Sequence, residues 1–381
     1  SRTCGTVYTR FQMLTPIPRT MRSIQIPALL VILLVFESVS AGTSNSGNRL
    51  LNDSIHPSSS ENNSTTLGWV TTFRGPFDDY ISDSEVYSDG RIISGGWFQG
   101  YLDLGENIDG MSSTADGQDR DFFLAWTDNN GTILSVVGGG SVGMDFISAV
   151  SIMPNGDVVI AGTYCLGSFD SDCSMQLGDL DPLEKRFPDD DGNVFVARID
   201  SSGNWIWATQ IQNFNELFVV DMLVSNSNQI HVAFTFRDDI NLNGDTVPGS
   251  LDASLAIVTF DDNGVMQSHI ETDTGAGVEP DGSLCSDGNG QMYAIMSFTE
   301  FFAIEEDSAV SQGGADLVVA SFTSTGWNWI LSATGQGDVR AWDCVGNANS
   351  GLKIVGEFSG NSTFGEFYTG PSLDCLLYTS D

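Results

Sequence analysis

From about residue 67 onward, hydrophobic and polar residues alternate over short segments, and most segments end in turns rich in Asp, Asn and Gly. A period near two is typical of β-strands, and glycine or Asx residues supply the positive φ that tight turns require. No segment combines a helical period with capping residues. The pattern therefore predicts an all-β protein made of short strands and tight turns.

The strands recur as a repeat with two landmarks. The first is an apolar strand that ends in an Asx-type turn with glycine, and its copies are residues 121–131, 193–203, 254–264 and 316–326, with Gly68 marking one more turn. The second is an Asx-Gly turn before another apolar strand, 22 to 26 residues further on, with Asn228 replacing the glycine in the third copy. Two landmarks that keep phase over five copies indicate a repeat architecture.

A unit of about 62 residues with four antiparallel strands is typical of a β-propeller blade. We expect four-stranded blades over residues 67–374, with about five repeats visible and an incomplete ring. Back-translated, residues 375–381 match a sequencing-library adapter, which predicts a chain truncated near Asp374. The alternative is a genuine strand, because Leu373-Asp374 also resembles the start of a repeat.

The repeat D-x-F-x-A-x-x-D-x-x-G followed by N-G-x-V-x-x-x-G resembles the SBBP (seven-bladed β-propeller) repeat family, over nearly all of residues 67–374. The resemblance implies a propeller of extracellular or surface repeats, usually without catalytic activity. The five visible copies depart from that family's blade number. Residues 197–205 also resemble a run found in quinoprotein propellers, but that family's vicinal disulfide and cationic cofactor contacts have no counterpart here.

The N-terminal region predicts export. Met21 and Arg22 precede an apolar run over 26–36 and a small-residue cleavage site between Ala41 and Gly42, which together indicate a signal peptide over 21–41. The apolar run is shorter than the roughly 20 residues of a membrane span. Residues 1–20 are then translated upstream DNA, and the Ser/Asn/Thr-rich residues 42–66 form a flexible linker. We expect an extracellular or cell-surface protein.

Charge narrows the range of partners. The chain has 50 acidic and 14 basic residues and a net charge of −36, and its only lysines are Lys185 and Lys353. A phosphate-backbone binder needs Lys and Arg, so the composition excludes nucleic acid and disfavours anionic membrane surfaces. We expect no membrane insertion by the mature part of the chain.

A long acidic insertion interrupts the second repeat between Cys165 and Gly192. Clustered carboxylates with glycine are typical of oxygen-ligand sites, so we interpret Ca²⁺ as the one cofactor that the sequence suggests. The predicted ligands are Asp179, Asp181, Asp189, Asp190 and Asp191. A solvated acidic loop remains the alternative. We expect binding to run through this insertion. We also expect the fold to survive trimming of the insertion to the length of the sister repeats, because every strand landmark lies outside it.

Covalent features suit an exported protein. Cys165 and Cys173 are close enough in sequence for a disulfide, while a Cys285–Cys344 pair between neighbouring repeats stays open. Glycosylation sequons occur at Asn52, Asn62, Asn63, Asn130 and Asn361.

Residues suited to catalysis are sparse. The three histidines, His56, His231 and His269, form no recognised catalytic or metal motif, and the sequence predicts structural roles for His231 and His269. Tryptophans follow the turn glycine in several copies, notably Trp205, Trp207, Trp327 and Trp329. We interpret these side chains as contacts between blades, with sugar stacking as the alternative.

Two functions remain. The first is a non-catalytic surface module that binds protein, glycan or divalent cations at the propeller rim. The alternative is an extracellular carbohydrate-active or quinone-dependent enzyme on the same scaffold. The sequence favours the first because it shows no catalytic constellation.

Overall fold

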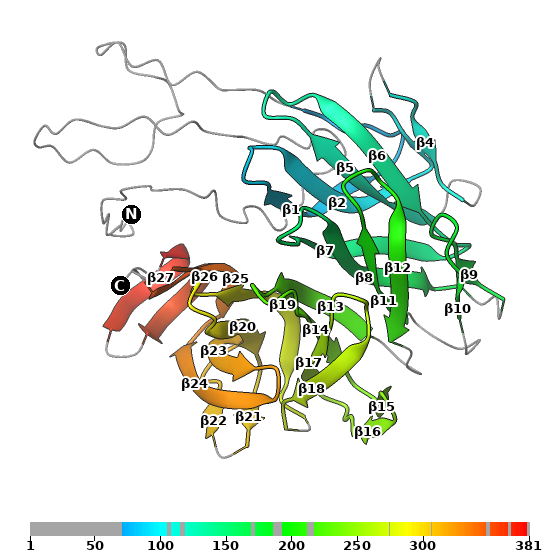
Figure 1. Cartoon of the computed structure of the whole chain (residues 1–381). Helices are drawn as coiled ribbons and strands as arrows, with labels where there is room; N and C mark the ends of the chain where they lie inside the picture. Colours follow the sequence, from blue (N-terminus) through cyan, green and yellow to red (C-terminus); the bar gives the residue numbers. More distant parts are fainter. Residues whose placement is uncertain are drawn as a thin grey trace, which may run out of the picture.

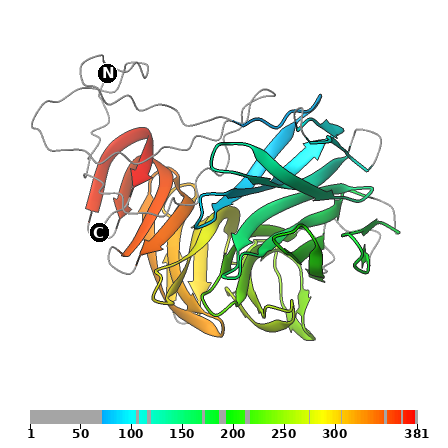
Figure 2. The same ribbon diagram turned by 45° about the horizontal axis from the view of Figure 1, so that its top comes forward.

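The computed structural model describes residues 71–104, 108–114, 119–168, 172–185, 193–211, 217–273, 275–305, 307–347, 351–364 and 367–378. Within these ranges the chain forms only strands and turns. Three four-stranded antiparallel sheets and one seven-stranded sheet, which comprises two blades, lie around a common centre as the blades of a β-propeller, and Figure 2 shows them side by side. The all-β propeller predicted from the repeat is confirmed.

The strands of each blade pair in chain order, apart from a small hairpin described below. Blade 1 contains β1 (Asp79–Val86), β2 (Ile92–Gln99), β5 (Arg120–Thr127) and β6 (Ile133–Gly139). Blade 2 contains β7 (Met144–Ile152), β8 (Val158–Leu166), β11 (Asn193–Ile199) and β12 (Trp205–Ile211). Blade 3 contains β13 (Leu217–Val224), β14 (Ile230–Phe236), β17 (Ser254–Phe260) and β18 (Met266–Glu271).

Blade 4 contains β19 (Val278–Ser286), β20 (Met292–Phe298), β23 (Asp316–Thr323) and β24 (Gly326–Gly335). Blade 5 contains β25 (Val339–Asn347), β26 (Gly351–Phe364) and β27 (Phe367–Tyr378). A short pairing of β24 with β26 joins the last two blades into one sheet. β27 continues across Asp374, the boundary at which the sequence suggested adapter-derived residues, and this pairing does not test their origin.

The structure divides the repeat at a different point from the sequence pattern. The second landmark lies between the first and second strands of a blade, and the first landmark lies between the third and fourth strands. Blade 1 therefore holds four strands from one continuous stretch, beginning at Asp79. The order of strands and turns was predicted, but their grouping was not, because every strand–turn–strand unit has the same local pattern.

Blades 1 to 4 each insert a small hairpin between their second and third strands. These hairpins are β3 (Tyr101–Leu102) with β4 (Met111–Ser112), β9 (Ser174–Met175) with β10 (Leu183–Glu184), β15 (Ile240–Leu242) with β16 (Asp245–Val247), and β21 (Phe301–Ile304) with β22 (Asp307–Val310). They lie at the outer edge of the molecule (Figure 1). The acidic insertion is thus an enlarged version of an element that four blades share.

The turns follow from their residues. Gly156 has a φ of 89°, and Asn228, which replaces glycine in the third copy, has a φ of 61°. Asparagine is among the few non-glycine residues that adopt this conformation readily. In the other turn, the Asp128 side chain accepts hydrogen bonds from the N–H groups of Asn130 and Thr132. These hydrogen bonds, the one from Thr132 foremost, lower the pKa of Asp128, so the recurring aspartate has a turn-forming role.

The first strand of each blade lies innermost (Figure 1). Aspartate side chains connect the first strands of neighbouring blades. Asp83 of β1 and Asp221 of β13 each follow a β-bulge. Asp83 accepts the N–H of Val150 in blade 2 at 2.8 Å, and Asp221 accepts that of Leu284 in blade 4 at 2.7 Å. Both carboxylates are buried. Each carboxylate accepts a backbone N–H group of the neighbouring blade, at a place where the two sheets are not joined by hydrogen bonds between strands.

Candidate functional site

The acidic insertion of blade 2 is held in place by a disulfide and by a lysine hydrogen bond. Cys165, at the end of β8, forms a disulfide with Cys173, with 6.1 Å between their Cα atoms. The Nζ of Lys185 donates to the carbonyl of Ser168 at 2.6 Å, and its side chain is buried. One of the two lysines of the chain therefore anchors this loop.

The insertion also contributes to the hydrophobic core. Met175 and Leu177 are buried together with Phe122 of blade 1 and Phe195 of blade 2. Trp205 packs against the same cluster. These buried side chains argue against the expectation that the insertion can be trimmed without loss of the fold, which stays a prediction.

We predict that Leu177→Ala lowers the free energy of unfolding by about 3 kcal/mol, because a fully buried leucine loses its contacts and leaves a cavity. Denaturant unfolding monitored by circular dichroism measures the change. Leu251→Ala is the matched control, since the Leu251 side chain is 93% exposed and its truncation should leave stability within about 0.5 kcal/mol. Equal effects for the two variants would contradict the core role of the insertion.

The proposed calcium ligands are only partly visible. Asp179 and Asp181 are exposed in the turn between β9 and β10. Asp189, Asp190 and Asp191 lie outside the described residues. Among the residues that the structure describes, no three His, Cys, Asp or Glu side chains are arranged to hold a metal ion. The calcium site stays a prediction.

Asn193 is a buried side chain next to that loop which the sequence analysis did not select. It begins β11, and neither its Oδ1 nor its Nδ2 has a hydrogen-bond partner. The equivalent residues of the other complete blades, Asp121, Ser254 and Asp316, all accept backbone N–H groups. A polar residue recurs at the start of the third strand in each of these blades, and this recurrence is the sequence signal that could have identified Asn193.

Asp145, near the start of β7, is a second residue that sequence reasoning missed. It is fully buried and accepts hydrogen bonds from the N–H and hydroxyl of Ser141 and from the N–H of Cys165. Burial raises its pKa to about 8. Desolvation outweighs the three donors because no cation is paired with the carboxyl. This group is neutral over much of the physiological range.

The two described histidines are structural. His231 is buried, shares a 3.0 Å hydrogen bond with Thr259, and burial lowers its pKa to about 4. His269 faces carboxylates with both ring nitrogens: Nδ1 is 3.0 Å from Glu271 and Nε2 is 3.6 Å from Asp245. The Nε2 of His231 has no hydrogen-bond partner, but the whole side chain is buried away from solvent. His56 lies outside the described residues.

The tryptophans make the predicted contacts between blades. Trp205 of blade 2 packs edge-on against Phe122 of blade 1. Trp207 donates its Nε1–H to the carbonyl of Asp262 in blade 3, and Trp327 of blade 4 donates to that of Glu271 in blade 3. Trp329 is the most exposed of the four, at 37%. Packing is confirmed for the first three.

Two cavities lie between blades 3 and 4. A small cavity of about 140 Å³ is lined by residues that include Phe218, Thr235, Arg237, Asp252, Glu279 and Pro280. A larger cavity of about 560 Å³, which we call the rim cavity, lies beside the hairpins, and its lining includes Pro248, His269, Glu271, Asp273, Glu305 and Trp327. Sequence reasoning selected neither, because each combines residues from two blades.

The sequence also predicted a second cysteine pair, glycosylation sequons and a signal cleavage site. Cys285 of β19 and Cys344 of β25 form a disulfide between neighbouring first strands, with 6.0 Å between their Cα atoms. Asn130 is exposed in its turn, and the amide of Asn361 donates to Gln336. Asn52, Asn62, Asn63, Ala41 and Gly42 lie outside the described residues.

Comparisons add little to this geometry. No family model and no curated protein sequence matches the chain. A structural comparison finds similarity to a chain in the structure of Drosophila Plexin A in complex with Semaphorin 1b, at 9% identity, covering 79% of this chain and 78% of that one. The TM-score is 0.27, which is too low to indicate a shared fold or function. The described part of the chain holds no helix of the length and hydrophobicity that a membrane crossing requires.

Proposed function

We propose that this protein is an exported or cell-surface β-propeller, of the kind that the SBBP resemblance implies, which acts as a non-catalytic binding module. Its ligand is a basic segment of a partner protein, and its site is the rim cavity between blades 3 and 4. The observation that carries the proposal is the lining of that cavity. Glu271, Asp273 and Glu305 stand beside the indole of Trp327 and the apolar side chain of Pro248.

This lining suits Lys and Arg side chains. Carboxylates attract the charged head, while an indole and a proline ring cover the aliphatic stem. The net charge of −36 adds long-range attraction for a basic partner and repulsion for an acidic one. A neutral glycan is the second candidate, since Trp327 lines the same cavity and carboxylates also accept hydroxyl hydrogen bonds.

Binding of a lysine-rich peptide, measured by calorimetry, tests the proposal. We expect the double variant Glu271→Gln/Glu305→Gln to bind at least tenfold more weakly. We also expect wild-type binding to weaken steeply as salt is raised from about 0.05 to about 0.5 M.

Asp109→Asn/Asp179→Asn is the matched control, because it removes two exposed charges elsewhere. Equal losses in both double variants would show a non-specific charge effect and contradict the proposal. Binding of neutral oligosaccharides without binding of the peptide would favour the second candidate. Calcium is tested separately: thermal stabilisation by Ca²⁺ should vanish when Asp189, Asp190 and Asp191 are changed to Asn.

The enzyme alternative has less support. Acid–base catalysis needs a titratable group with access to substrate, and His231 is buried while both nitrogens of His269 face carboxylates.

A further inference from the structure

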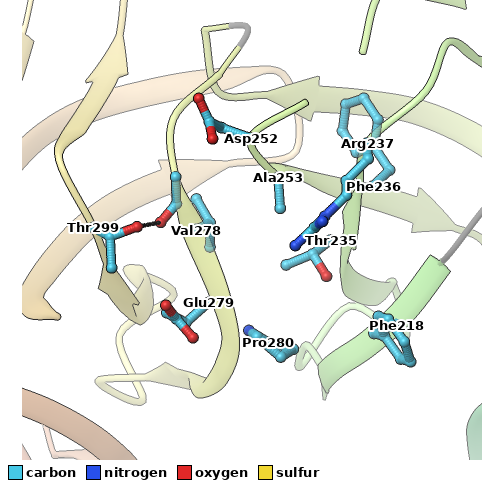
Figure 3. A pocket seen from close by; sticks show the side chains of 11 residues that line it. Phe218, Thr235, Phe236, Arg237, Asp252, Ala253, Val278, Glu279, Pro280 and Thr299 are labelled. Carbon is cyan, nitrogen blue, oxygen red and sulfur yellow. Dashed lines mark hydrogen bonds between the residues drawn. The ribbon is translucent and has the colours of Figure 1, made fainter. Parts of the chain in front are cut away.

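The small cavity between blades 3 and 4 contains a cation without an ionic partner. Arg91, Arg198 and Arg340 each form an ion pair with an aspartate. Arg237, which follows the end of β14, forms none with any residue that the structure describes. Figure 3 shows its side chain reaching into the middle of the cavity. The Arg237 side chain is exposed, so its guanidinium is available to a ligand that enters the cavity from solvent.

Two carboxylates line the same cavity at different edges. Glu279 is half-buried on β19, and Asp252 is exposed ahead of β17 (Figure 3). A simple anion placed on Arg237 would meet both carboxylates as well as the negative field of the protein. A simple cation placed on Glu279 would meet Arg237. A ligand that carries both charges a few ångströms apart is attracted by both groups and repelled by neither.

The size and walls of the cavity narrow the ligand further. A volume of about 140 Å³ has room for the head of a small ligand. Phe218 and Pro280 supply apolar walls. The hydroxyl of Thr299 already donates to the carbonyl of Gly277, whereas Thr235 adds a second hydroxyl to the lining.

We propose that this cavity binds the zwitterionic head of a free α-amino acid. The ligand carboxylate lies on the guanidinium of Arg237, whose planar fork can donate two parallel hydrogen bonds. The ligand ammonium lies on Glu279, because a half-buried carboxylate attracts a cation more strongly than the exposed Asp252. The site is separate from the rim cavity, so it does not depend on the function proposed above.

L-alanine, L-alaninamide and propionate are the probes, titrated into the full chain by calorimetry. We expect L-alanine to bind, and we expect at least tenfold weaker binding of the amide, which lacks the carboxylate, and of propionate, which lacks the ammonium. Arg237→Gln and Glu279→Gln should each weaken L-alanine binding at least tenfold. Arg91→Gln, which removes an arginine already paired with Asp89, should leave it unchanged.

Circular dichroism verifies that each variant is folded, and the three probes on wild-type protein keep the test independent of any variant. Absence of L-alanine binding would overturn the proposal, as would equal binding by Arg237→Gln. Equal affinity for propionate would show a simple carboxylate site and would also refute a zwitterion-specific one.

Discussion

Replacing Cys285 and Cys344 by serine is expected to lower the free energy of unfolding by about 4 kcal/mol. The disulfide joins first strands of blades 4 and 5 across a sequence separation of 59 residues. In the unfolded chain, a cross-link that closes a loop of this length removes conformational entropy worth about 4 kcal/mol at 25 °C. Denaturant unfolding of the oxidised wild type and of the double variant measures the difference.

The shorter Cys165–Cys173 disulfide, with a separation of 8 residues, is the internal control. Its removal should cost less, because loop entropy falls with loop length. Hydrogen exchange should also show the loss of protection concentrated in β25 and β26 for the first variant. A loss spread evenly over all blades, or no difference between the two disulfides, would contradict the assignment.

The second large effect is a fall in stability as pH rises, carried by Asp145. Its pKa is about 8 in the folded protein against 3.8 for an unperturbed carboxyl. The folded state thus binds the proton more tightly, so this group favours folding at low pH. That contribution is lost progressively as pH rises from about 4 to about 8. Between pH 7 and 8 we expect the free energy of unfolding to fall by about 1 kcal/mol.

Other buried groups act below that window. Burial raises the pKa values of Asp79 and Asp121 to about 6, which adds stability as pH falls through that value. His231 acts in the opposite direction: its folded pKa of about 4 lies below its ordinary 6.5, so stability is lost as pH falls between these values. The range from pH 7 to 8 lies above all these values, so Asp145 dominates the pH dependence there.

Asp145→Asn should remove most of the slope between pH 7 and 8, because an amide does not titrate. Asp128→Asn is the control: Asp128 lies in an exposed turn and its pKa is lowered, so the slope should persist. Chemical denaturation at several pH values measures both. A slope that survives in Asp145→Asn would assign the pH dependence to other groups, such as the general charge repulsion of an acidic chain.

The strands, the turns and the class of fold can be predicted from the sequence without the structure. The short apolar runs of the third strands, and glycine or Asn228 at the positive-φ turn positions, are properties of residues a few positions apart. The third strands are buried on both faces, and a short apolar run between turn residues indicates such a strand without knowledge of the tertiary structure. The tryptophan contacts between blades followed from the same repeat, since a position that recurs in every blade meets a neighbouring blade each time.

The boundaries between blades, and the side chains that meet across them, become visible only in the folded protein. Asp83 and Val150 are joined across 67 positions, and Asp221 and Leu284 across 63. Leu177 sits in an acidic loop by sequence yet lies in the core by packing. Arg237 and Glu279 line one cavity from two different blades. Such contacts depend on how sheets stack around the centre, and residues some 60 positions apart carry no local pattern that states their distance in space.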